Sequence, residues 1–409
     1  MERRKTLFLA AGVALLAGLG ARPAPPAQTN PAPPQAPVPS SSTAGSTQFA
    51  FGGNVAEIPA AFVGGLVLLP LHVNQSQPCL FVLDSTAAST SIDPGRAVEL
   101  GIAPGAAELE FAGVTLRLPE LPRAPRQDFD TRFGRAYEGT LGRDFFESFV
   151  VGVDYARKTV RLYDPAGYQY SGKGKGLHPS FAGDMPVVPA KFNTNGKTLE
   201  ADMGVDTALD ASVLFFERYA NAHRMLAHLK TIPAMDDVPA DSRDALLGRM
   251  RLFEIESFPV QQAIATFARQ EPGATGGPKL AGEIGGGMLA RFDVVFDYPH
   301  QQIIFEPNSD RRVDEIEDMS GVSLIATGPG LRRFEVTQVR SGTPGAEAGL
   351  QKGDVIAGID EDPAADLSLV QVRDLFRQLG HPYRLTVERN EQTLHLTMKL
   401  KRLLPANES

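Results

Sequence analysis

The sequence has 409 residues, of which 43 % are hydrophobic and 22 % are charged, as in ordinary globular proteins. This length is enough for two or three domains. The formal net charge of −8 at pH 7, without a basic stretch interleaved with aromatic residues, argues against nucleic acid as a partner. Cys79 is the only cysteine, so the chain cannot form a disulfide within itself and its fold has to depend on a hydrophobic core.

The N-terminus has the pattern of an export signal. A basic start over residues 2–5 precedes an apolar run over 7–20 that is too short and too rich in Gly and Ala for a membrane span. We therefore expect residues 1–21 to be a signal peptide, the protein to be periplasmic or extracellular, and no membrane span to remain once the signal is cleaved. Residues 22–50 are rich in Pro, Ala and Ser and predict a disordered linker.

Residues 51–166 and 181–307 carry the same order of segments, which indicates an internal duplication. Each half contains a strand-like segment that ends in an aspartate followed by a small hydroxyl residue, Asp84-Ser85 in the first half and Asp206-Thr207 in the second. Each half then has a short apolar–glycine element and an alternating strand that ends in Asp-Tyr. These later elements are Leu141-Gly142 with Asp154-Tyr155, and Ile284-Gly285 with Asp297-Tyr298.

A duplication of this kind can bring one aspartate from each half to a common point. Two carboxyl groups held a few ångströms apart do not both ionise easily, so the pair tends to keep a shared proton. One member can then take a proton from a water molecule while the other donates a proton to a substrate carbonyl. We therefore predict that Asp84 and Asp206 are catalytic, that Ser85 and Thr207 fix their geometry, and that the reaction needs neither a metal nor another cofactor.

A separate C-terminal unit is predicted over residues 320–403, after a charged linker over 308–318. It has two strand-like segments near its start, a helix over 368–379 and two alternating strands at its end. Between the early strands and the helix lies the run Gly-Thr-Pro-Gly-Ala-Glu-Ala-Gly-Leu-Gln-Lys-Gly-Asp-Val-Ile over 342–356.

These motifs resemble two known families. The duplicated region resembles the bilobal retropepsin-like, or pepsin-type, bacterial aspartic proteases, in which each lobe carries Asp-Thr/Ser-Gly and later an apolar–apolar–Gly element. The run over 342–356 resembles the corresponding run of PDZ domains. The fold class expected from these resemblances is mostly β, with a pepsin-like acid-protease β-barrel whose lobes are 51–166 and 181–307, followed by an α+β PDZ domain over 320–403.

The resemblances also imply functions for both parts. An aspartic endopeptidase hydrolyses peptide bonds, and the PDZ domain would recruit its protein or peptide substrates. PDZ domains add an extended peptide as a strand, and a glycine-containing loop holds the C-terminal carboxylate of that peptide. The residues that we expect to form this loop are Gly330, Leu331, Arg332 and Phe334.

One departure from the protease pattern leaves a second function open. The third motif residue, a glycine in the family, is Thr86 in the first lobe and Ala208 in the second. Glycine lets the two active loops approach closely, whereas a Cβ at both positions, β-branched at Thr86, can push them apart or rotate an amide. The alternative to an active endopeptidase is therefore a catalytically inactive peptide-binding protein. Aspartates that point into separate environments would leave only that alternative.

Overall fold

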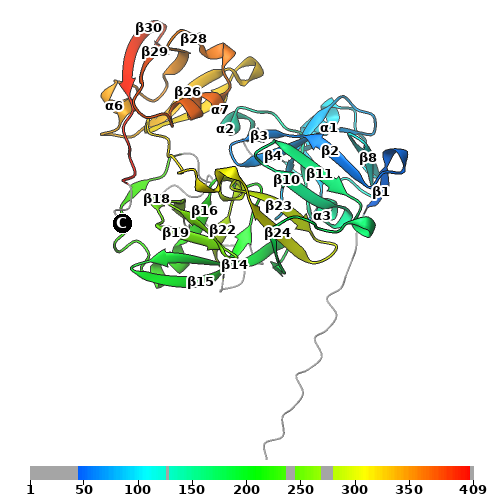
Figure 1. The fold of residues 1–409 in the computed structure, drawn as a ribbon. Helices are drawn as coiled ribbons and strands as arrows, with labels where there is room; N and C mark the ends of the chain where they lie inside the picture. The colour runs from blue at the N-terminus through cyan, green and yellow to red at the C-terminus, as the bar shows by residue number, and fades with distance from the viewer. Residues whose placement is uncertain (1–44, 126–128, 236–244, 269–279, 406–409) are drawn as a thin grey trace, which may run out of the picture. The chain divides into compact units, whose positions relative to one another are not determined.

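The computed structural model describes residues 45–125, 129–235, 245–268 and 280–405, all of which belong to one compact unit. The expected signal peptide over 1–21 and the expected linker as far as residue 44 lie outside the described residues. The described chain is mostly β, and its strands form four sheets (Figure 1). Within these residues, no helix is both long enough and apolar enough to cross a membrane.

The first half of the duplication, which we call lobe 1, is built on an eight-stranded sheet in the order β1-β8-β7-β4-β5-β9-β6, with β3 paired to β4. The strands are β1 Ser46–Phe49, β3 Ala61–Val63, β4 Leu66–Val73, β5 Cys79–Leu83, β6 Ser91–Ile92, β7 Ala107–Phe111, β8 Val114–Leu118 and β9 Gly139–Leu141. The helices are α1 Pro94–Glu99, α2 Phe129–Phe133 and α3 Arg143–Ser148.

Strand β1 corrects the expected extent of the linker over 22–50. Ser46 to Phe49 pair antiparallel with Arg117 to Val114 of β8 and extend the sheet by one edge strand. The physical reason is that β8 offers a free edge, and a polar segment can satisfy its backbone hydrogen bonds there without contributing to the core.

The second half, lobe 2, is built on a ten-stranded sheet in the order β17-β18-β21-β16-β22-β15-β14-β19-β20, with β13 paired to β14. A two-residue turn joins β14 to β15, and both turn residues, Asn195 and Gly196, have positive φ, as hairpin turns of this length require. The strands are β13 Ser180–Ala182, β14 Met185–Thr194, β15 Lys197–Val205, β16 Val213–Phe216, β17 Thr231–Pro233, β18 Leu246–Arg249, β19 Leu252–Ile255, β20 Phe258–Gln261, β21 Ile264–Ala268 and β22 Leu280–Ile284. The helices are α4 Glu217–Ala222 and α5 Gly286–Leu289.

A six-stranded sheet contains strands of both halves, in the order β12-β24-β23-β10-β11-β2. At its centre β10 pairs antiparallel with β23, so that equivalent strands of the two halves lie side by side. The aspartates that end β10 and β23 form turns, because Asp154 accepts from the amide of Arg157 and Asp297 from that of His300. The strands are β2 Val55–Pro59, β10 Val150–Asp154, β11 Thr159–Tyr163, β12 Lys175–Leu177, β23 Phe292–Asp297 and β24 Gln302–Pro307.

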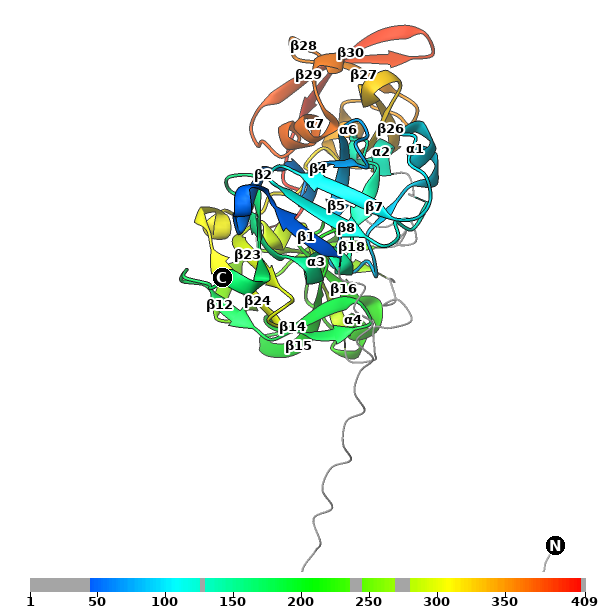
Figure 2. The same cartoon turned by 90° about the vertical axis from the view of Figure 1, so that its right-hand side faces the viewer.

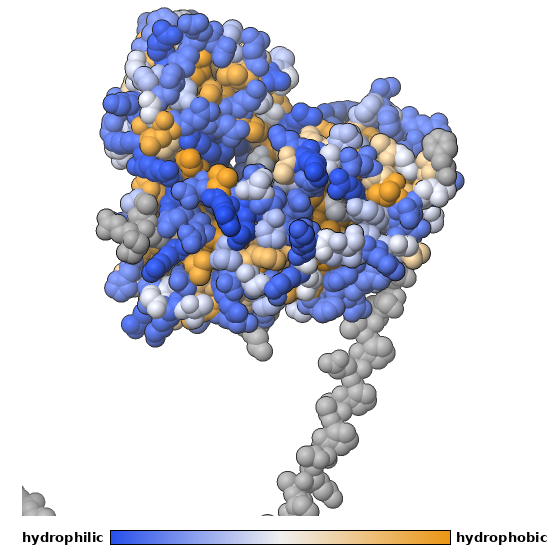
Figure 3. Space-filling model, viewed as in Figure 1, coloured by the Kyte–Doolittle hydropathy of each residue, from blue (hydrophilic) through white to orange (hydrophobic). Residues whose placement is uncertain are grey.

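The hydrophobic core follows this arrangement. One continuous cluster contains residues of both halves, among them Phe81, Phe146, Phe215 and Phe296, all fully buried. Most of the surface in the view of Figure 3 is hydrophilic, with hydrophobic residues in scattered positions. The buried cluster therefore supplies the stability that a chain with one cysteine cannot obtain from disulfides.

The C-terminal sheet has the order β25-β26-β27-β29-β30, with β28 paired to β27 (Figure 2). Buried side chains of this part form a separate core. Helix α7, Leu369–Leu375, begins at a capping box in which Ser368 and Gln371 each bond the other's backbone. The remaining elements are β25 Val322–Thr327, β26 Arg333–Val339, α6 Pro344–Glu347, β27 Val355–Ile359, β28 Asp362–Pro363, β29 Pro382–Arg389 and β30 Gln392–Lys399.

Candidate active site

The two predicted aspartates occupy equivalent positions in the two halves. Asp84 follows β5, which pairs parallel with β9, and Asp206 follows β15, which pairs parallel with β22. The amide of Asp84 donates to the carbonyl of Leu141 at 3.0 Å, and the amide of Asp206 donates to the carbonyl of Ile284 at 2.9 Å. The apolar–glycine element of each half thus holds the aspartate of the same half in place.

Reciprocal hydrogen bonds join the two aspartate loops, and we call them the cross-lobe bonds. The Ser85 hydroxyl donates to the carbonyl of Val205 at 2.7 Å, and the Thr207 hydroxyl donates to the carbonyl of Leu83 at 2.8 Å. Each hydroxyl also accepts from the other residue's amide, at 3.0 Å from Ser85 and 3.1 Å from Thr207. Both side chains are fully buried, so water does not compete for these bonds.

The expected disturbance by Thr86 and Ala208 is absent from these loops. The Thr86 amide donates to Oδ1 of Asp84 at 2.9 Å, and the Thr86 hydroxyl donates to the same oxygen at 2.7 Å. The amide of Ala208 donates to Oδ1 of Asp206 at 2.8 Å. The expectation that a Cβ would part the loops or rotate an amide is therefore wrong here, because neither residue needs positive φ and the hydroxyl of Thr86 adds a donor.

The charge of Asp84 acts on two other carboxyl groups at this point. The pKa of Asp206 is raised well above its ordinary value, first by burial and then by the negative charges of Asp84 and Glu283. Burial and the charge of Asp84 raise the pKa of Glu283 to about 7. The two aspartates therefore share one electrostatic environment, in which a protonated Asp206 can lie beside an ionised Asp84.

Glu283 was missed by the sequence reasoning. It lies on β22, in the Gly-Glu-Ile-Gly segment that was read only as an apolar–glycine element. Its side chain is 4 % exposed, and its Oε2 atom has no hydrogen-bond partner among the described residues. The available signal was the acidic residue itself, because an apolar residue is expected where a strand is buried on both faces.

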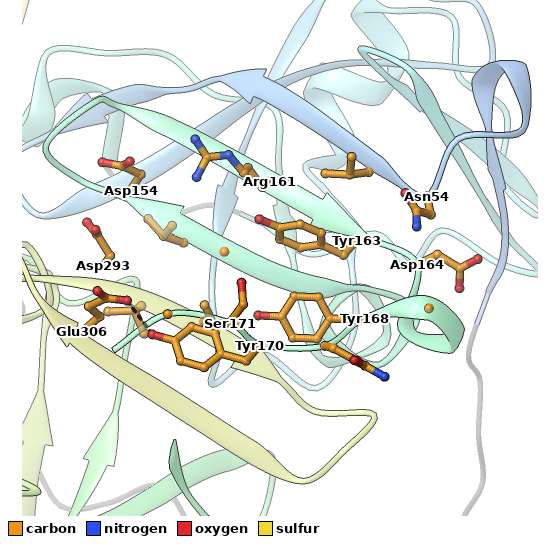
Figure 4. Close-up of a pocket in the computed structure, with 18 of the residues that line it drawn as sticks. Asn54, Asp154, Arg161, Tyr163, Asp164, Tyr168, Tyr170, Ser171, Asp293 and Glu306 are labelled. Carbon is orange, nitrogen blue, oxygen red and sulfur yellow. Dashed lines mark hydrogen bonds between the residues drawn. The ribbon is translucent and has the colours of Figure 1, made fainter. Parts of the chain in front are cut away.

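A second group of acidic residues lines a cavity of about 400 Å³ on the six-stranded sheet (Figure 4). Asp154 and Asp293 are cross-strand neighbours there, and burial, Asp154 and Glu306 together raise the pKa of Asp293 to about 6. Arg157 lies 3.2 Å from the Asp154 carboxylate, and the Tyr170 hydroxyl donates to Glu306 at 2.5 Å.

This cavity differs from the aspartate loops in how its charges are held. Arg161, which also lines it, pairs with Glu57 at 2.7 Å. The lining residues do not include Asp84 or Asp206. Asp154, Asp293 and Glu306 of this cavity lie on strands, and Arg157 neutralises Asp154 in part, whereas the aspartate loops place two carboxyl groups at strand ends under reciprocal hydroxyl bonds. The loops are therefore the better candidate for acid–base chemistry.

Within the described residues, no group of three or more His, Cys, Asp and Glu side chains has the arrangement of a metal site.

The loop predicted to hold a peptide carboxylate lies between β25 and β26. Gly330, Leu331 and Arg332 form the turn itself, and Phe334 is fully buried on β26. Strand β26 is paired on both sides, with β25 and with β27, so an added peptide strand has no free edge there. Strand β25 is paired with β26 alone in the described sheet, and helix α2 of lobe 1 lies against it.

The loop that leads into β25 is the alternative that the sequence reasoning missed. It contains Gly321, whose φ is +67°, a conformation that favours glycine. A Cβ on this glycine would lie 2.4 Å from the side chain of Thr343. The signal was the Ser-Gly pair directly before the first strand, but choosing between the two loops required knowing which strand lies at the sheet edge.

The comparisons with known proteins bear on the C-terminal part of the chain. Among curated proteins, none matches the chain. Residues 308–400 match the PDZ domain family, a range that begins in the expected charged linker and ends directly after β30. PDZ domains bind peptides and proteins by strand addition. The C-terminal part of the chain is therefore a PDZ domain.

Proposed function

We propose that the duplicated region is a pepsin-like aspartic endopeptidase and that the PDZ domain recruits its protein substrates. The cross-lobe bonds carry this proposal. Four reciprocal hydrogen bonds at 2.7–3.1 Å hold the loops of Asp84 and Asp206 against each other, although the residues that each bond joins lie 120 to 124 positions apart in the sequence. A geometry so fully determined supports a pair of carboxyl groups that act together.

The proposed reaction divides two roles between the aspartates. Asp84, ionised, takes a proton from a water molecule whose oxygen attacks the carbonyl carbon of the peptide bond. Asp206, protonated because of its raised pKa, donates its proton to the carbonyl oxygen. The tetrahedral intermediate then collapses, its nitrogen takes a proton from Asp84, the C–N bond breaks, and Asp206 recovers its proton from the hydroxyl group.

The hydrogen bonds around the aspartates favour this division of roles. Oδ1 of Asp84 accepts from two amides and from the Thr86 hydroxyl, and three donors stabilise a negative charge. Asp206 accepts from the amides of Ala208 and Leu209, and its burial favours the neutral form. Each carboxyl group thus begins the reaction in the protonation state that its environment favours.

Cleavage of an unfolded protein between pH 4 and pH 7 tests the proposal. We expect products from the wild type and a loss of activity of about a hundredfold or more in Asp84→Asn and in Asp206→Asn. Asp202→Asn is the matched control, because Asp202 is an exposed aspartate on β15, four residues before Asp206. Equal cleavage by all four proteins would remove the pair from the mechanism. No cleavage by the wild type, with peptide binding retained, would assign the region to the inactive peptide-binding class.

A further inference from the structure

The register of the lobe 2 sheet places Glu283 beside the catalytic pair. Glu283 is the in-register neighbour of Gly204 on β15, and Asp206 follows Gly204 by two residues. Side chains two apart on a strand point to the same face, as do neighbours on adjacent strands. The Glu283 side chain therefore lies on the face from which Asp206 projects, which agrees with the part that the charge of Glu283 has in raising the pKa of Asp206.

The surroundings of Glu283 on this face are apolar. Its neighbour on β16 is Leu214, and Val187 lies across Gly204 on β14. Leu214 and Val187 belong to a small buried cluster that is separate from the main core and includes Leu209. Glu283 is thus a carboxyl group in an apolar wall, and the charge that acts on it is that of Asp84.

Because Gly204 has no side chain, Met185 fills the place next to this carboxyl group. A Cβ on Gly204 would lie 3.3 Å from Cγ of Glu283 and 2.1 Å from the sulfur of Met185. Met185 is only half-buried, and a methionine side chain is flexible enough to move aside. A ligand side chain that displaces Met185 would therefore reach Glu283.

Lobe 1 has no such acid at the equivalent place. Thr140 on β9 pairs with Val82 on β5, as Glu283 pairs with Gly204. Val82 belongs to another small cluster, which contains Phe133 and Tyr137. The two sides of the catalytic pair therefore differ, with a neutral wall on the lobe 1 side and a wall that contains a buried acid on the lobe 2 side.

A buried carboxylate without a partner is unfavourable, and a ligand that supplies the missing cation relieves that cost. Lysine and arginine side chains match the wall in two respects, because their aliphatic stems pack on apolar residues while their charged ends bond a carboxylate. We propose that Glu283 determines specificity by binding the lysine or arginine side chain of a substrate residue adjacent to the cleaved bond. This inference rests on the proposed peptidase function and names its substrate class.

Binding of peptides that cannot be cleaved tests the inference separately from hydrolysis. Two peptides carry a reduced amide in place of the scissile bond and differ in one residue next to it, which is lysine in one and norleucine in the other. Each is made with that residue on either side of the bond. Their C-termini are amidated, so that the PDZ domain has no terminal carboxylate to bind.

We expect the wild type to bind one lysine peptide about tenfold more tightly than its norleucine counterpart, as a charge-assisted hydrogen bond allows. Glu283→Gln should remove this preference, and Glu283→Asp, which keeps the charge, should retain part of it. Glu200→Gln is the control, because Glu200 is an exposed acid on β15. A preference for the lysine peptide that Glu283→Asp retains and Glu283→Gln loses cannot result from misfolding.

The outcomes separate the two proposals. Equal affinities in the wild type, no binding of the lysine peptides, or an unchanged preference in Glu283→Gln would each overturn the role of Glu283, even if the wild type cleaves proteins. A lysine preference that depends on Glu283, together with equal cleavage by the wild type and Asp84→Asn, would instead overturn hydrolysis by the aspartate pair and leave the basic-residue site in place.

Discussion

Replacing Thr207 by valine removes half of the cross-lobe bonds with little change in side-chain shape. The Thr207 hydroxyl donates to the carbonyl of Leu83 at 2.8 Å and accepts from the amide of Ser85 at 3.0 Å. Both partners are buried, and a buried polar group that loses its partner costs about 1–3 kcal/mol. Thr207→Val should therefore lower the free energy of unfolding by about 2–5 kcal/mol.

Urea unfolding followed by far-UV circular dichroism measures this change, since the chain has no tryptophan to report by fluorescence. Thr198→Val is the matched control, because the Thr198 hydroxyl bonds Asn193 at an exposed hairpin and its loss should cost less than about 0.5 kcal/mol. We expect Ser85→Ala to resemble Thr207→Val and the double variant to fall short of the sum, because either change lets the loops part. A loss below about 0.5 kcal/mol in Thr207→Val would refute the reasoning.

Three other predictions concern separate features. A glutamate whose pKa rises from 4.5 to about 7 on folding stabilises the fold below pH 4.5 and loses that contribution as the pH rises through 7. The free energy of unfolding of Glu283→Gln, measured with urea, should therefore rise by about 3 kcal/mol relative to that of the wild type between pH 4 and pH 8. Gly282→Ala should lower the thermal midpoint by about 5 °C or more, because its Cβ would lie 1.9 Å from a carbonyl oxygen of β16, whereas Gly152→Ala, whose nearest contact is 3.5 Å, should change it little. Gly321→Val should abolish binding of a peptide with a free C-terminus to the PDZ domain, whereas Arg332→Ala should change the affinity less than about twofold in a titration. The reverse result would place the carboxylate loop at Gly330 to Arg332, as the sequence predicted.

The aspartate loops could be predicted from the sequence because the duplication repeats short local motifs. Asp84 and Asp206 each end a strand, and the hydroxyl residue after each aspartate makes the expected bonds to the other loop. The effect of Thr86 could not be predicted, because it depends on where the hydroxyl points once the loop has closed.

The features that the sequence reasoning missed depend on which strands are neighbours. Glu283 shares a face with Asp206 only through the register of β22 against β15. Strand β1 exists because β8 has an edge to pair with, which a polar segment does not reveal by its own pattern. The PDZ motif over 342–356 located the domain, but the choice between Gly321 and Gly330 for the carboxylate loop depends on the strand order of the sheet.

The distance along the chain between Ser85 and Thr207 has a consequence for synthesis. The hydrogen-bonded pair is separated by 122 positions, so a ribosome completes the first aspartate loop long before it makes the second. A nascent or prematurely terminated chain that lacks lobe 2 has only one of the two acids and none of the cross-lobe bonds. Since both loops belong to one polypeptide, the finished pair also persists at any dilution, unlike a pair contributed by two separate chains.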